Sequence, residues 1–169
     1  MFKLTGSLLA VSLYIVSFPA MAANFAGLSF GKADVDISGY DTSSTSKFFA
    51  GHRAGTFGFE AAYINMGNFI ATGSADYVHV EGAELSGMAF HDVGSVTFFG
   101  KAGLFAWDTQ ASTTSLTIPT DNGIDITYGI GVLYKFAAIP FSVRAEYQIF
   151  KDVSTTDIDM WTIGAHFWF

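Results

Sequence analysis

Charged side chains within apolar, alternating segments are the residues of this chain best able to do chemistry. Arg144 and Glu146 are two positions apart in the run Phe141–Phe150, so an extended strand turns both to the same face. Glu60 and Lys101 lie in similar surroundings in two earlier runs. A buried charge is costly unless an opposite charge pairs with it. These four residues therefore predict charges that neutralise one another in a closed interior.

Histidine is the other side chain here that can act as a base or a metal ligand. His52 and His91 lie near short connections, His79 lies near the end of a long one, and His166 belongs to the inner face of the last strand. None is part of a Gly-x-Ser-x-Gly or His-Glu-x-x-His motif, and the sequence has no His-x-Ser pair. We expect no enzyme, no metal and no cofactor, with a lipid-modifying barrel enzyme as the least favoured alternative.

Eight strand-like runs are available to position these side chains. Most have about the 9–11 residues that a tilted membrane-spanning strand requires. The runs are Asn24–Ala33, Lys47–Arg53, Thr56–Met66, Tyr77–Phe90, Val96–Trp107, Ile124–Phe136, Phe141–Phe150 and Ile158–Phe169.

The connections between these runs alternate in length. The long, polar connections are Asp34–Ser46, Gly67–Asp76, Asp108–Gly123 and Lys151–Asp157, and the short ones are 54–55, 91–95 and 137–140. Long loops on one side and tight turns on the other are typical of outer-membrane barrels, whereas a soluble β-sandwich has no reason for such alternation. The sequence therefore predicts an all-β fold, an eight-stranded antiparallel up-and-down transmembrane β-barrel.

Alternation within the strands assigns their faces. An Arg facing lipid near the midplane costs about 2–4 kcal/mol, so the face that carries Arg144 and Glu146 must be the inner one. The same reasoning turns Lys101 inward, and Phe99, Phe105 and Trp107 follow it. Since eight strands leave an interior just wide enough for side chains to fill, we expect a filled lumen and a monomer.

The N-terminus has the features of a secretory signal peptide. Lys3 supplies the positive region, Leu8–Phe18 is apolar, and Ala20-Met21-Ala22 is a small-x-small cleavage site. We expect residues 1–22 to be removed and residues 23–169 to form the barrel domain. No later window approaches the roughly 20 apolar residues of a spanning helix.

The composition fits a lipid-facing exterior better than a soluble domain. Half of the residues are hydrophobic and 14% are charged, against about 25% charged in typical domains. One domain of this length could not hide so much apolar surface from water. The formal net charge of −7 argues against nucleic acid as a partner, and the absence of Cys excludes a disulfide scaffold.

The last nine residues resemble the terminal strand of bacterial outer-membrane barrels. Their outer face is apolar, and the chain ends on an aromatic residue; this face consists of Trp161, Ile163, Ala165, Phe167 and Phe169. In that family the last strand is read by the barrel assembly machinery. The resemblance implies that Phe169, with Phe167, is the assembly signal. It also implies residence in the outer membrane of a Gram-negative bacterium, among membrane lipid and lipopolysaccharide.

Several inner stretches are similar to the transmembrane domain of outer membrane protein A (OmpA). The Arg-x-Glu-Tyr-Gln stretch is the most specific of them, and the first two runs match weakly. The matching stretches are Gly58–Tyr63, Lys101–Thr109, Gly129–Tyr134 and 144–148.

In the OmpA family a network of acidic and basic side chains plugs or gates a narrow water path in the lumen. The resemblance puts Glu60 and Arg144 at network positions, with Lys101 and Glu146 as neighbours. Met88 and Leu133 stand where the family pattern has a Lys and a Glu. We therefore expect a Glu60–Arg144 pair, extended by Lys101 and Glu146, rather than a switchable quartet.

The expected function follows from the barrel and its loops. We expect no periplasmic peptidoglycan-binding domain after Phe169, so tethering to the cell wall is not carried over from the family. We expect a structural or surface-contact protein of the OmpA-like or porin-family type, with at most a narrow pore. The alternative is an adhesin or ligand-binding barrel whose unknown partner meets the extracellular loops, above all the Ser- and Thr-rich Asp108–Gly123.

Overall fold

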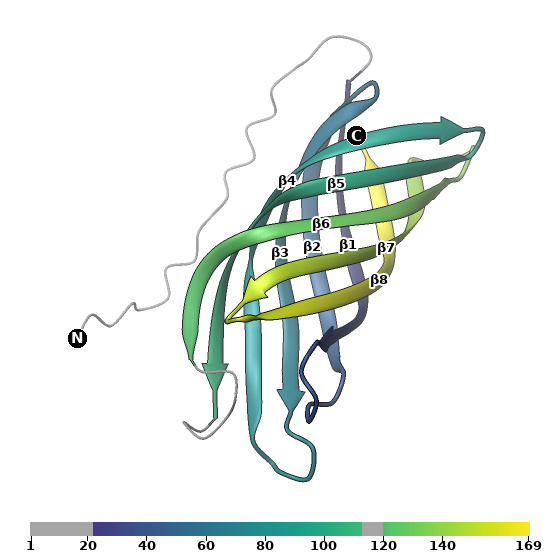
Figure 1. The fold of residues 1–169 in the computed structure, drawn as a ribbon. Coiled ribbons are helices and arrows are strands. Elements are labelled where there is room, and N and C mark those ends of the chain that lie inside the picture. Colours follow the sequence, from purple (N-terminus) through teal and green to yellow (C-terminus); the bar gives the residue numbers. More distant parts are fainter. Residues whose placement is uncertain (1–21, 113–119) are drawn as a thin grey trace.

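The computed structural model describes residues 22–112 and 120–169 as one closed β-barrel (Figure 1). The eight strands follow the chain in order. They are β1 (Ala22–Val35), β2 (Ser43–Ala54), β3 (Phe57–Ile70), β4 (Tyr77–Val93), β5 (Val96–Ala111), β6 (Asp121–Lys135), β7 (Phe141–Val153) and β8 (Thr156–Trp168). In this part of the chain, no helix is long and apolar enough to cross a membrane.

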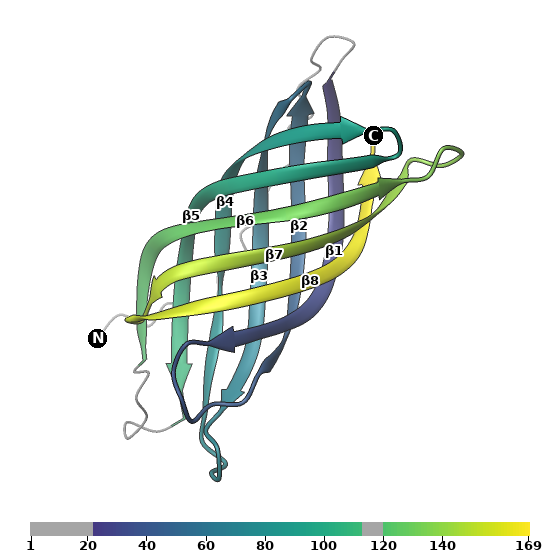
Figure 2. The ribbon, with the colours of Figure 1, turned by 45° about the vertical axis from the view of Figure 1, so that its right-hand side comes forward.

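Every strand pairs antiparallel with its sequence neighbours, and β1 closes the barrel on β8. Backbone hydrogen bonds between Asn24 and Phe169 complete this seam, at 3.0 and 2.9 Å. The turns 55–56, 94–95 and 136–140 lie at the same end as the C-terminus, and we call this the turn end (Figures 1 and 2). The connections 36–42, 71–76 and 154–155 lie at the opposite end, the loop end, where β5 ends at Ala111 and β6 begins at Asp121.

The outer face between the two ends is apolar. On β3, Phe57, Phe59 and Tyr63 point outward, and on β5, Phe98 and Leu104 do so, each about half exposed or more. A soluble protein rarely exposes such a continuous patch, whereas a barrel in lipid requires it. The predicted eight-stranded transmembrane β-barrel and the predicted faces of these strands are confirmed.

The inner face is filled by side chains, with aromatic rings laid over glycines. A Cβ on Gly131 would lie 2.3 Å from the Phe99 ring, and one on Gly27 would lie 2.3 Å from the Phe49 ring. Only glycine lets each ring cross its neighbouring strand so closely. These glycines therefore make room for the inward-facing rings of Phe99 and Phe49.

The strands extend further toward the loop end than the alternation predicted. The prediction of a long polar connection at Lys151–Asp157 is wrong, because β7 and β8 continue to a two-residue turn at Ser154 and Thr155. Both turn residues have positive φ, 47° and 74°. Their small polar side chains led the sequence to predict a loop, but the structure has a two-residue hairpin turn there.

Two expectations fall outside the described residues. The signal peptide was predicted for residues 1–22, of which 1–21 are not described. The Ser- and Thr-rich centre of the predicted Asp108–Gly123 loop, residues 113–119, is not described either.

Candidate functional site

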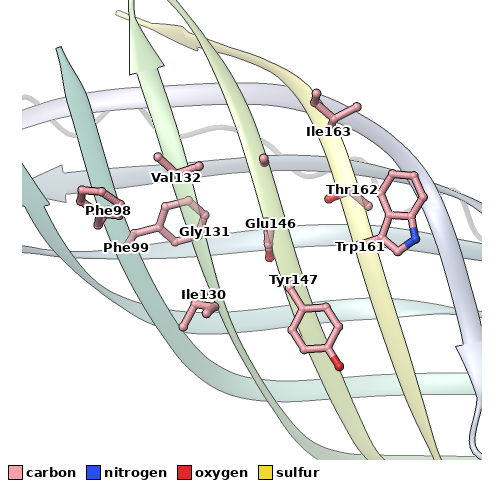
Figure 3. A pocket seen from close by; sticks show the side chains of 11 residues that line it. Phe98, Phe99, Ile130, Gly131, Val132, Glu146, Tyr147, Trp161, Thr162 and Ile163 are labelled. Carbon is pink, nitrogen blue, oxygen red and sulfur yellow. The ribbon is translucent and has the colours of Figure 1, made fainter.

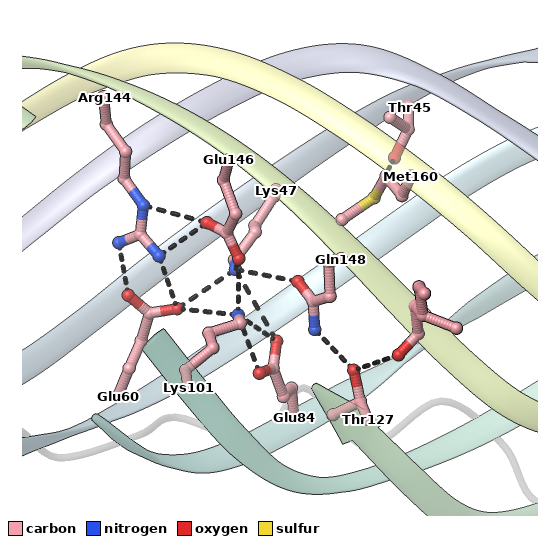
Figure 4. A network of polar contacts seen from close by, with 11 residues as sticks. Thr45, Lys47, Glu60, Glu84, Lys101, Thr127, Arg144, Glu146, Gln148 and Met160 are labelled. Carbon is pink, nitrogen blue, oxygen red and sulfur yellow. Dashed lines mark hydrogen bonds and ion pairs between the residues drawn. The ribbon is translucent and has the colours of Figure 1, made fainter. Parts of the chain in front are cut away.

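Six charged side chains meet in the middle of the lumen (Figure 4). Three are cationic and three are carboxylates, and every one of these side chains has no exposed surface. They come from five strands: Lys47 on β2, Glu60 on β3, Glu84 on β4, Lys101 on β5, and Arg144 and Glu146 on β7. We call these six residues the charge network.

Arg144 joins two of the carboxylates. Its guanidinium forms a bidentate pair with Glu60, in which Nη2 lies 3.2 Å from Oε1. The same group donates to Glu146, with Nη2 and Nε at 2.5 and 2.9 Å from Oε2. The guanidinium carbon also lies 4.4 Å from the centre of the Phe49 ring and 4.5 Å from that of Phe99. Ion pairs and ring contacts together fix this side chain across the barrel.

The two lysines bridge the three carboxylates. Lys47 Nζ lies 3.0 Å from both Glu60 Oε1 and Glu146 Oε1. Lys101 Nζ lies 2.7 Å from Glu146 Oε1 and 2.8 Å from Glu84 Oε1. Each carboxylate is therefore in contact with at least two cations, which offsets the cost of removing these charges from water.

Uncharged polar groups border the network toward the loop end. Gln148 Oε1 accepts from Lys47 Nζ at 3.4 Å, and Gln148 Nε2 donates to Thr127 Oγ1 at 2.7 Å. Beyond them the lumen is lined by buried apolar side chains, which we call the loop-end core: Ile64, Met66, Phe69, Val78, Val80, Phe105, Phe150 and Ile158. The network is thus sealed from the loop end.

Aromatic rings and a second ion group close the turn end. His166 is fully buried, with its ring centre 4.5 Å from that of Phe25 and 4.4 Å from that of Trp168. At the mouth, Asp92 accepts from Arg53 at 2.6 Å and from Lys135 at 3.1 Å. These two contacts connect β2, β4 and β6 across the opening.

This arrangement suits charge neutralisation rather than a reaction. The network carries no net charge, and all six of its side chains are buried and paired with one another. Within the described ranges, no group of three or more His, Cys, Asp or Glu side chains could hold a metal ion. The histidines lie at separate places: His52 and His91 near the turn end, His79 toward the loop end, and His166 in the lumen.

The structure brings Glu60, Lys101, Arg144 and Glu146 into one cluster. Sequence reasoning missed the other two members, Lys47 and Glu84. The signal for both was present, since a charge in the middle of a membrane-spanning strand must turn inward as Lys101 does. The sequence predicted the strands that carry Lys47 and Glu84, but not which face of each strand turns inward.

The network differs from the OmpA-family pattern at two positions. Met88 and Leu133, which stand where that pattern has a Lys and a Glu, are buried apolar residues at 4% and 1% exposure. Lys47 and Glu84 supply the same two types of charge from other positions on β2 and β4.

The two aromatic residues predicted as the assembly signal lie on the outer face at the turn end. Phe167 is 37% exposed and Phe169 is 50% exposed. Their rings stack with centres 6.0 Å apart, and Phe141 packs against Phe167 at 5.0 Å. They form part of an apolar, aromatic edge.

Similar folds occur among solved outer-membrane barrels. Ail, the attachment invasion locus protein of Yersinia pestis, superposes with a TM-score of 0.64 at 13% identity, over 89% of this chain and 100% of Ail. Neisserial surface protein A gives 0.61 at 15% identity, over 89% and 98%. The N-terminal β-barrel domain of Pseudomonas aeruginosa OprF gives 0.60 at 12% identity, over 88% and 98%.

No protein-family model and no curated protein matches the sequence. The likeness therefore concerns the fold. This chain has the fold of the small eight-stranded outer-membrane barrels, and the predicted likeness to OmpA-type barrels is confirmed at that level.

Proposed function

We propose that this protein is a small integral outer-membrane protein that presents its loop end at the cell surface on a closed, non-conducting barrel. The observation that carries the proposal is the charge network, whose six side chains are buried, paired and neutral as a group. A pore needs a continuous polar path, and buried charges that neutralise one another obstruct such a path.

Closure at the loop end supports the same function. The loop-end core stacks apolar side chains above the network, and the rings of Phe105 and Phe150 meet there at 4.7 Å. An ion crossing this layer would lose its water and gain few polar ligands, because the buried Thr45 and Thr109 hydroxyls there already donate to backbone carbonyls. The loop end is therefore a rigid support for the connections between strands rather than the entrance to a channel.

The loop end carries a strong excess of negative charge. Its acidic residues on the outer surface and in the connections include Asp34, Asp36, Asp41, Asp76, Asp108, Asp121, Asp152, Asp157 and Asp159. Ail has been crystallised with the heparin analogue sucrose octasulfate. A sulfated polysaccharide would be repelled by this acidic surface, so we propose a contact partner with a neutral or cationic surface.

The membrane setting of this function rests on the outer face. Its apolar band would contact lipid, including lipopolysaccharide, and Phe167 with Phe169 would be the signal read by the assembly machinery. The barrel needs no second copy to bury its interior, so we propose a monomer.

Surface binding separates this proposal from its alternatives. We expect the full chain, reconstituted in vesicles with the loop end outward, to bind amine-coated beads more strongly than sulfate-coated beads. A variant with Asp34→Asn, Asp36→Asn and Asp76→Asn should show a weaker preference, because three of the loop-end negative charges are removed. Asp92→Asn at the turn end is the matched control. Stronger binding of the wild type to sulfate-coated beads would contradict the proposed partner, and recovery in a soluble periplasmic fraction would contradict membrane residence.

A further inference from the structure

Two hollows of the barrel differ in their chemistry. The larger one crosses the outer face of β5, β6, β7 and β8 and has a volume of about 730 Å³. Figure 3 shows Phe98, Ile130 and Trp161 around it. Because its walls are mainly apolar, the acyl chains of any membrane lipid would cover it. This groove therefore offers nothing that distinguishes one ligand from another.

The second hollow opens at the turn end, at the mouth of the lumen. Its volume is about 430 Å³, which is within the usual size of a ligand site. It holds charged side chains from β2, β4 and β6. We call it the turn-end pocket, and its lining residues are Ala23, Arg53, Gly55, Asp92, Lys135 and Trp168.

The charges of the turn-end pocket are two cations and one carboxylate. Arg53 Nη2 lies 2.6 Å from Asp92 Oδ2, and Lys135 Nζ lies 3.1 Å from Asp92 Oδ1. Among the described residues, neither cation forms an ion pair with a second carboxylate. The pocket therefore carries one excess positive charge, which an anion would balance.

One oxygen of Asp92 is shared by three donors. Asp92 Oδ1 accepts from Arg53 Nη1 at 3.2 Å, from Lys135 Nζ at 3.1 Å and from the Thr97 hydroxyl. Because the two cationic nitrogens meet at the same oxygen, one further anion is able to bridge them. That anion would also offset the repulsion between two like charges held so close together.

Both cations keep N–H donors for a ligand. Arg53 directs two of its five donors to Asp92 and a third, Nε, to the Gly55 carbonyl at 2.7 Å. Lys135 directs one of its three ammonium donors to Asp92. The remaining donors come from β2 and β6, two strands that are not neighbours in the barrel.

Aromatic rings hold both cations at the wall of the pocket. The Arg53 guanidinium carbon lies 4.5 Å from the centre of the Phe90 ring, and Lys135 Nζ lies 5.4 Å from that of the Trp168 ring. Trp168 in turn donates from Nε1 to the Ser142 hydroxyl at 3.0 Å. The donors are thus positioned before a ligand arrives, which lowers the entropic cost of binding.

We propose that the turn-end pocket binds one phosphate group between Arg53 and Lys135. The oxygens of a tetrahedral phosphate point in several directions, so it accepts from both side chains while Asp92 keeps its own contacts. Arg and Lys are the two side chains that most often bind phosphate. With the loop end at the cell surface, as the proposed function has it, the turn end faces the periplasm. A free phosphate and the headgroup of a phospholipid in the periplasmic leaflet present the same chemistry there.

Isothermal titration calorimetry of the refolded full chain in a nonionic detergent tests the free anion. The probe is inorganic phosphate, and acetate is the comparison. We expect one phosphate site, with acetate at least tenfold weaker. Lys135→Gln and Arg53→Gln should each weaken binding by about tenfold, equivalent to about 1.4 kcal/mol. Equal binding of acetate would overturn the assignment to phosphate.

Native mass spectrometry of the same preparation tests the lipid headgroup. The probes are dioleoylphosphatidylglycerol and dioleoylglycerol, which lacks the phosphate. One retained phosphatidylglycerol, lost in Lys135→Gln, would assign the site to a lipid headgroup, and phosphate binding in the titration alone would assign it to the free anion. Failure of both probes, or equal retention of dioleoylglycerol, would overturn the site.

Lys151 provides a matched control. Its side chain is 38% exposed and pairs with Asp157, as that of Lys135 is 35% exposed and pairs with Asp92. Lys151→Gln should leave both measurements unchanged, and Lys135→Arg, which keeps the charge, should retain binding. Heat-modified gel mobility checks that each variant is folded, and only folded material is compared.

Acetylation of the unaltered chain locates the site without a substitution. N-hydroxysuccinimidyl acetate is the reagent, and peptide mass spectrometry gives the rate at each lysine. Whichever probe binds, inorganic phosphate or dioleoylphosphatidylglycerol, should slow acetylation of Lys135 several-fold and leave Lys151 unchanged. Equal rates at Lys135 with and without the bound probe would overturn the site.

Failure of this inference is distinguishable from failure of the proposed function. If the chain inserts into membranes as a closed barrel but binds neither probe, the inference fails and the proposed function stands. If the inserted chain conducts ions, the proposed function fails, while phosphate binding at Arg53 and Lys135 is still measured in detergent.

Discussion

The charge network and the loop-end core fill the same lumen by opposite means. In the network, each carboxylate of Glu60, Glu84 and Glu146 is in contact with cations from at least two other side chains. In the loop-end core, the buried side chains are apolar and pack against one another. Removing one charge leaves its partners buried and unpaired, whereas trimming one apolar side chain leaves only a small void.

The two layers should therefore respond differently to single substitutions. Single substitutions in the network are costly because its members depend on one another across five strands. The loop-end core tolerates change because its contacts are many and individually weak. Three substitutions test this contrast, in order of decreasing effect on the free energy of unfolding.

Arg144→Ala should have the largest effect. Breaking a buried pair by removing one partner typically costs about 3–5 kcal/mol, and Arg144 pairs with both Glu60 and Glu146. Urea unfolding in lipid vesicles, followed by heat-modified gel mobility, measures the loss. Adding Glu60→Ala to the same chain should recover part of it, and a double-mutant cycle without coupling would mean that the two charges do not meet.

Gly131→Ala should have an intermediate effect. The added Cβ would lie 2.3 Å from the Phe99 ring, and that ring packs against Arg144. Overpacking of this kind costs about 1–3 kcal/mol. Gly100→Ala is the matched control, because its Cβ would meet only a backbone oxygen at 4.0 Å. Equal unfolding free energies for the two variants would show that Phe99 does not depend on the glycine.

Ile64→Val in the loop-end core should have the smallest effect. Ile64 is fully buried, and loss of one methyl group there costs about 0.5–1.5 kcal/mol. The same urea titration applies, with Ile130→Val on the outer face as the control. A loss as large as that of Arg144→Ala would remove the contrast between the two layers.

Much of the fold could be predicted from the sequence, because period-2 alternation, together with a costly charge in several of the strands, fixes which side chains face inward. The inner face of β7 was predicted in this way from Arg144 and Glu146, and the inner face of β5 from Lys101. The same logic extends to Lys47 and Glu84, although it was not applied to their strands. The loop-end core could not be predicted, since an inward Phe69 or Val78 looks like an outward one when both faces of a strand are apolar.

The tight turn at Ser154 and Thr155 was missed for another reason. Small polar residues in the sequence predict a loop there. Only the structure shows their positive φ angles and the pairing of β7 with β8 that makes the connection a hairpin turn. The contacts within the network could not be predicted from the sequence either. They depend on which strands face each other across the lumen, and closure of the barrel determines this.

Single-channel recording of the refolded chain in planar bilayers tests the central claim, that the charge network and the layers around it close the lumen. Insertion is verified first by heat-modified mobility of the same preparation. We predict a baseline current without discrete steps across the applied voltages. Stable, reproducible conductance steps from the inserted wild-type protein would contradict a closed barrel.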